Sequence, residues 1–194
     1  GFAILEIVGG IWTGSVAILS DAVHDLGDAL ALASAYVFER LAKRQPTPRY
    51  SYGYRRLSLL SALFTSAFLL VGSAFVLAEA VPRLLAPTTP KLEGMLRFAV
   101  LGVAVNGYAA WRLIRGGGTM NERVISWHLI EDVLGWLTVL IGTVVMMIVD
   151  LPIIDPILSI IFTLFIVYNV MRSLGATLRL FLQATPRDID LEAC

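Results

Sequence analysis

Long apolar runs follow one another almost from end to end of this chain, and they limit its fold more than any other feature. Of its 194 residues, 57% are hydrophobic, and the mean hydropathy is +0.78. A soluble domain is about 45–50% apolar and does not repeat stretches of this length. We therefore expect an all-α, polytopic protein that lies in a lipid bilayer.

Glycine and proline residues divide the apolar runs into six segments that we expect to be helices. A glycine turn follows the first segment, prolines end the third and the fifth, and three consecutive glycines end the fourth. The expected helices cover residues 1–13, 16–42, 55–85, 92–114, 122–149 and 155–182. A span needs about 20 residues, so all but the first are long enough to cross a bilayer. We expect that the first helix is truncated.

The loop charges indicate the orientation of these helices. Most of the fifteen Lys and Arg residues lie between the second and third helices, between the fourth and fifth, or near the end of the sixth. Because basic residues accumulate in cytoplasmic loops, we expect both termini in the cytoplasm. The formal net charge is zero, and no basic surface suggests a nucleic acid as a partner. The single cysteine, Cys194, excludes a disulfide framework and a thiolate metal site.

Two His-x-x-x-Asp segments stand out inside the apolar runs. One joins His24 to Asp28 and the other joins His128 to Asp132, and together they contain the only two histidines. Residues four apart on a helix share a face, with Cβ atoms about 5–6 Å apart. Two such helices facing each other offer two imidazoles and two carboxylates, which complete a tetrahedral shell for a zinc-like ion. Ionisable residues within a membrane are functional-site candidates by default.

Depth in the bilayer indicates whether the two segments can meet. Counted along the second helix, the first segment lies roughly 17 Å below the outer face, and the other lies roughly 10 Å above the inner face on the fifth helix. The two depths add to about 27 Å, which is close to the thickness of the hydrocarbon core, about 30 Å. Both segments are therefore expected at nearly the same level.

Further acidic residues share the faces of these two segments. Asp21 and Asp25 accompany the first, and Glu131 accompanies the second. Lipid cannot solvate so polar a face, so it must point to the bundle interior or to a water-filled cavity. A four-coordinate ion does not need these three carboxylates. We expect them to line the route or relay protons rather than to be primary ligands.

Two other interpretations of the histidines remain open. In the first, each His–Asp pair is a structural hydrogen bond that holds helices together. In the second, the two histidines are axial ligands of a haem. Haem needs an apolar socket, whereas each histidine here has a carboxylate one turn away. The sequence has no nucleophile–base pair and no phosphate-binding glycine loop, so we expect neither an enzyme nor an organic cofactor.

Several short motifs, taken in order along the chain, resemble the cation diffusion facilitator family. The resemblance covers essentially the whole sequence. The motifs are Glu6 to Gly10, Gly14 to Ala22 with its continuation to Asp28, Tyr52 to Arg56, Asn106, and Asp155 to Ser159.

The resemblance implies export of divalent metal ions from the cytoplasm in exchange for protons, by alternating access in a homodimer. It also implies two ligands from the second helix and two from the fifth, which by matching position are His24, Asp28, His128 and Asp132. A site of two His and two Asp is similar to the zinc-preferring branch. The expected substrate is therefore Zn²⁺, with Cd²⁺, Co²⁺, Mn²⁺ or Fe²⁺ as alternatives. The ligands bind metal in their deprotonated forms, so metal and protons compete for one site.

The resemblance also suggests a domain organisation. Residues 1–182 are expected to form the six-helix transport domain, and residues 183–194 to begin a linker to a cytoplasmic C-terminal domain that is absent from this chain. The loop between the second and third helices has no histidine, which favours a bacterial source. The expected location is the bacterial inner membrane.

Overall fold

Six α-helices make up the part of the chain that the structure describes. The computed structural model describes residues 2–43, 57–115 and 120–182, and these ranges contain no strand. The helices are α1 (Phe2–Thr13), α2 (Val16–Ala42), α3 (Leu57–Leu85), α4 (Leu92–Arg115), α5 (Met120–Val149) and α6 (Ile154–Phe181). The all-α, six-helix prediction is confirmed, and the helix ends lie within two residues of the predicted ones. The predicted start of the third helix, Arg55, lies outside the described residues.

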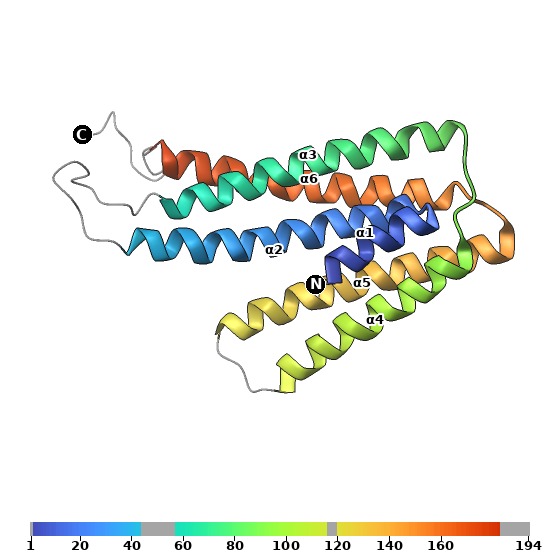
Figure 1. Ribbon diagram of the computed structural model, residues 1–194, viewed down its shortest axis with the longest axis horizontal. Coiled ribbons are helices and arrows are strands. Elements are labelled where there is room, and N and C mark those ends of the chain that lie inside the picture. The colour runs from blue at the N-terminus through green and yellow to red at the C-terminus, as the bar shows by residue number, and fades with distance from the viewer. Residues whose placement is uncertain (1, 44–56, 116–119, 183–194) are drawn as a thin grey trace, which may run out of the picture.

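The helices run roughly along one axis and pack in pairs (Figure 1). α3 lies beside α6, α4 lies beside α5, and α1 lies beside α2, which also contacts α3 and α6. The ends of α2 and α6 at Ala42 and Phe181 lie at one end of the bundle, which we call the Ala42 end. The turns after Thr13 and Val149 lie at the opposite end, which we call the Thr13 end.

A tight turn at Gly14 folds α1 back against α2. Gly14 has φ +75°, a left-handed conformation that glycine adopts without a steric penalty. Its N–H donates to the carbonyl of Gly10 at 2.9 Å, which closes the last turn of α1. The hairpin that results places the middle of α1 against the first half of α2.

Asp155 of α6 caps the beginning of α2. Its carboxylate accepts hydrogen bonds from the Ser15 hydroxyl at 2.5 Å, the Val16 N–H at 2.8 Å and the Ala17 N–H at 3.3 Å. The first N–H groups of a helix have no partner within the helix, and a carboxylate there also complements the helix dipole. Asp155 is 1% exposed, so this contact fixes α2 against α6 inside the protein.

The core lies between α1, α2, α4 and α5. Trp136 of α5 is 1% exposed and packs in a cluster with Ile18, Met95 and Val139. The indole of Trp136 lies directly over Gly102 of α4, where a β-carbon would overlap the ring. The absence of a side chain at Gly102 therefore lets α4 approach α5 closely.

The outer surface of the bundle is apolar, as a membrane protein requires. Large hydrophobic side chains are exposed on every helix, including Ile4, Leu32, Phe75, Val100, Ile141 and Leu164. Three of the described helices are long and apolar enough to cross a membrane: α3 from Leu59, α5 from His128, and α6. α2 has the length but also carries the acidic residues near His24.

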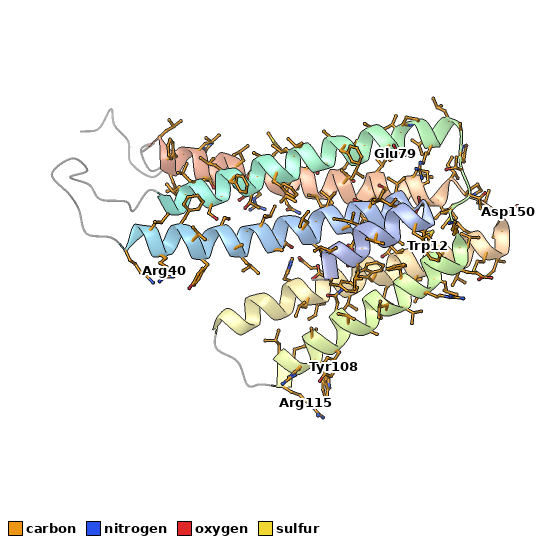
Figure 2. The ribbon with its side chains drawn as sticks, viewed as in Figure 1. Trp12, Arg40, Glu79, Tyr108, Arg115 and Asp150 are labelled. Carbon is orange, nitrogen blue, oxygen red and sulfur yellow. The ribbon has the colours of Figure 1, made fainter. Side chains whose placement is uncertain are left out.

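Charged side chains gather toward the two ends of the bundle. Figure 2 shows Arg40 and Arg115 toward the Ala42 end, and Glu79 and Asp150 toward the Thr13 end. Among the described basic residues, those toward the Ala42 end are Arg40, Lys43, Arg112, Arg115, Arg172 and Arg179, and those toward the Thr13 end are Arg83, Lys91 and Arg97. The charge asymmetry on which the predicted orientation rests is thus present in the folded bundle.

Candidate metal centre

The two His-x-x-x-Asp segments face each other where α2 and α5 approach. His24 and Asp28 lie one turn apart on α2, and His128 and Asp132 lie one turn apart on α5. The two imidazole rings are 5.8 Å apart between centroids, with an angle of 69° between their planes. The expectation that residues separated by a hundred positions meet at one level agrees with this geometry.

The polar atoms of these four side chains are within a few ångströms of one another. Nε2 of His128 lies 2.8 Å from Oδ2 of Asp28, and Nε2 of His24 lies 3.6 Å from the same oxygen. Nε2 of His128 lies 3.9 Å from Oδ2 of Asp132. One ligand atom each from His24, His128 and Asp132 lies within 4.8 Å of the others.

These separations are slightly larger than a bound zinc ion requires. Tetrahedral zinc with bonds of about 2.0–2.1 Å places its ligand atoms about 3.3 Å apart. The separations of 3.6 Å for His24 to Asp28 and 3.9 Å for His128 to Asp132 must therefore shorten by a few tenths of an ångström, whereas that of His128 to Asp28, 2.8 Å, must lengthen.

The four side chains line a large cavity. Its volume is about 1050 Å³, and it lies between α2, α3, α5 and α6. The side chains of His24 and Asp28 are each 31% exposed and that of His128 is 40% exposed, whereas Asp132 is 8% exposed. Solvent therefore reaches both histidines, and Asp132 forms the buried side of the group.

The lining of the cavity extends from the histidines in both directions. Toward the Thr13 end it includes Ser20, Thr138 and Ile161, and in the other direction it continues along α2 to Ala35, along α3 to Ser61 and along α6 to Ser173. These last positions lie progressively nearer the Ala42 end. An ion that enters from that end therefore reaches His24 and His128 without crossing the apolar core around Trp136.

The three additional carboxylates do not all lie in the same place. Asp21 and Glu131 line the cavity, and their place along an ion route stays a prediction. Asp25 instead groups with Asp21 and with Glu6 of α1. Glu6 is fully buried, and sequence reasoning assigned it no role beyond a family motif. The sequence could have singled out Glu6, because it is the only acidic residue in α1.

Comparison with known proteins places the chain in a family. The sequence profile of the cation efflux transmembrane domain matches residues 1–182. The chain is 33% identical to the zinc transporter ZitB of Pectobacterium atrosepticum over 194 residues, which cover 99% of this chain and 61% of that protein.

Two further relatives are named as metal transporters. The chain is 31% identical to the cadmium, cobalt and zinc/H(+)-K(+) antiporter of Bacillus subtilis over 98% of this chain and 62% of that protein. It is also 31% identical to the metal cation efflux system protein CzcD of Cupriavidus metallidurans over 98% of this chain and 60% of that protein.

The chain thus spans about three fifths of the length of these relatives. The family is one of membrane transporters and not of enzymes, in agreement with the prediction from the sequence. The assignment of residues 183–194 to a linker stays a prediction, because those residues lie outside the described ranges. The matched profile and the identities over nearly all of the sequence show that the chain belongs to the cation efflux, or cation diffusion facilitator, family.

Proposed function

We propose that this chain is the transport domain of a proton-coupled exporter of divalent cations, with Zn²⁺ as its main substrate. The proposed ligands are His24, Asp28, His128 and Asp132. The observation that carries the proposal is the meeting of the two His-x-x-x-Asp segments at a cavity between α2 and α5. Two imidazoles with two carboxylates suit zinc, whereas oxygen-only groups suit harder ions.

The names of the relatives support metal efflux more broadly than zinc alone. One is a zinc transporter, and another exchanges cadmium, cobalt and zinc for protons and potassium. Cd²⁺ and Co²⁺ are therefore the first alternative substrates to test. The family assignment favours transport over the haem and purely structural interpretations of the histidines.

We take the Ala42 end as the cytoplasmic end, because most basic residues lie there. The cavity lining that continues from the ligands toward that end supports entry of the ion from the cytoplasm. Release on the other side requires α2 and α5 to open the centre toward the Thr13 end.

The contact between His128 and Asp28 provides a physical basis for proton exchange. Nε2 of His128 and Oδ2 of Asp28 are 2.8 Å apart, which is the length of a charge-assisted hydrogen bond. A metal ion bound to both atoms takes the place of the proton between them. When the imidazole carries two protons, binding the metal releases one.

Transport into proteoliposomes tests the proposal directly. Purified protein is reconstituted, a pH difference is imposed, and the uptake of Zn²⁺, Cd²⁺, Co²⁺ and Mn²⁺ is measured with a fluorescent indicator inside the vesicles. We expect zinc uptake that depends on the pH difference and is abolished in the His24→Ala/His128→Ala variant. Thr138→Ala is the matched control, because Thr138 lines the same cavity while its hydroxyl donates to the carbonyl of Leu134.

Two outcomes contradict the proposal. Uptake that is equal in the double variant and the wild type excludes the proposed ligands. A purified protein with a Soret absorbance band supports the haem interpretation instead. The homodimer, the cytoplasmic termini and the bacterial inner membrane remain parts of this proposal.

A further inference from the structure

A second group of carboxylates adjoins the candidate metal centre on the side of α1. One carboxylate oxygen each from Glu6, Asp21 and Asp25 lies within 4.8 Å of the others. Glu6 comes from α1, and Asp21 and Asp25 lie one turn apart on α2. We call these three residues the carboxylate group.

The polar atoms of the carboxylate group lack partners in the interior. Glu6 is 0% exposed, and neither of its carboxylate oxygens has a hydrogen-bond partner among the described residues. Oδ2 of Asp21 is also buried without one. None of the ion pairs found in the described ranges includes a member of this group. A buried carboxylate needs a hydrogen bond, a countercharge, a metal ion or a proton, so either a cation or protons must neutralise this group.

The spacing of the three oxygens suits a bound cation. Oxygen ligands lie about 2.3–2.6 Å from Ca²⁺ and about 2.0–2.1 Å from Mg²⁺. Two oxygens bonded to one cation at about 2.4 Å lie at most about 4.8 Å apart, and the three oxygens of the group all lie within 4.8 Å of one another. Because no nitrogen or sulfur takes part, the group favours a hard divalent ion such as Mn²⁺.

We propose that Glu6, Asp21 and Asp25 bind a second divalent cation in an all-oxygen site between α1 and α2. The site adjoins the His–Asp centre, since Asp25 directly follows His24 and Asp21 also lines the main cavity. It is separate from that centre because its third ligand comes from α1.

The position of this site suggests a role in the path of the ion. Asp21 lies one turn closer to the Thr13 end than His24 does, in the part of the cavity lining that also includes Ser20 and Thr138. The carboxylate of Asp21 also lies beside α5, with Oδ1 3.8 Å from where a β-carbon on Gly135 would be. An ion that leaves the His–Asp centre toward the Thr13 end therefore meets this site next. This role, unlike the binding site itself, rests on the proposed transport function.

Titration of the purified chain with Mn²⁺, followed by electron paramagnetic resonance, tests the site. The His24→Ala/His128→Ala background removes the nitrogen ligands of the neighbouring centre. We expect this variant to bind one Mn²⁺ per chain and expect added Glu6→Gln to weaken that binding by at least tenfold. Asp21→Asn should do the same, which provides a second variant if one fails to fold. Glu93→Gln, a fully exposed acid on α4 outside both groups, is the control.

The result that overturns the proposal is specific to this site. If the double-histidine variant binds no Mn²⁺, or binds it equally well with Glu6→Gln or Asp21→Asn, the carboxylate group holds only protons. Zinc transport by the wild type is measured separately, so failure of the second site does not affect the proposed function. Loss of zinc transport in turn leaves the Mn²⁺ result valid.

Discussion

At the scale of single residues, the two histidines carry the main prediction. His24→Ala/His128→Ala should weaken zinc binding by more than about 100-fold, because even partners that only orient a ligand contribute about 10- to 100-fold. Isothermal titration calorimetry in detergent measures the change, and Thr138→Ala should bind zinc as the wild type does. Circular dichroism should show that the helices are retained. Wild-type affinity in a folded double variant would remove both histidines from the site.

His24 should also determine which metal the site prefers. Imidazole suits zinc, whereas a site richer in oxygen suits Mn²⁺ better and discriminates less between ions. His24→Asp should therefore raise the transport of Mn²⁺ and Cd²⁺ relative to Zn²⁺ by several-fold. Competition between the three ions in proteoliposomes measures this ratio. Unchanged relative rates would show that selectivity comes from other residues.

The four residues of the candidate metal centre and the three residues of the carboxylate group differ in how far the sequence predicted them. His24, Asp28, His128 and Asp132 follow from a repeated four-residue spacing, which helical geometry converts into a shared face. Glu6 offers no such spacing, because its partners lie on another helix. Its proximity to Asp25 arises only from the hairpin at Gly14, and a turn does not by itself reveal which faces come together.

At the scale of helices, Asp155 is the residue whose loss should do the most damage. Its carboxylate accepts hydrogen bonds from the Ser15 hydroxyl and from the first N–H groups of α2. Each buried polar group left without a partner costs about 1–3 kcal/mol. Asp155→Ala should therefore lower the free energy of unfolding by about 3 kcal/mol, seen as a fall of several degrees in the melting temperature by tryptophan fluorescence. Glu93→Gln, which is exposed, should leave it unchanged.

A melting temperature that Asp155→Ala does not alter would show that α2 begins independently of α6.

Helix boundaries were predictable because glycines and prolines interrupt the apolar runs. The pairing of α3 with α6 and of α4 with α5 was not, because apolar periodicity shows only that a face is buried and not its partner. The contact between Gly102 of α4 and Trp136 of α5 could likewise not be predicted from the sequence.

At the scale of the whole molecule, the orientation in the membrane can be tested with the single cysteine, Cys194. If the termini are cytoplasmic, a membrane-impermeant maleimide should label Cys194 in inside-out vesicles and not in intact spheroplasts. Leu151→Cys in a Cys194→Ser background is the matched control, because Leu151 is exposed in the turn at the Thr13 end. It should show the opposite pattern. Labelling of Cys194 from outside would reverse the orientation and make the cavity face outward.

Proton coupling is the property of the whole transporter that depends most directly on the geometry of its centre. The imidazoles of His24 and His128 bind metal in their neutral form, so protons compete with the metal for the same nitrogen atoms. Zinc affinity should therefore rise as the pH increases. In proteoliposomes, the same competition should let an imposed proton gradient drive zinc in the opposite direction, and an uncoupler should slow the flux. Affinity that is constant from about pH 5.5 to 8, a window on both sides of the usual histidine pKa, would exclude competition at this centre. Proton coupling would then have to come from other groups, such as Glu131, an acidic residue of the cavity lining that is not a proposed ligand.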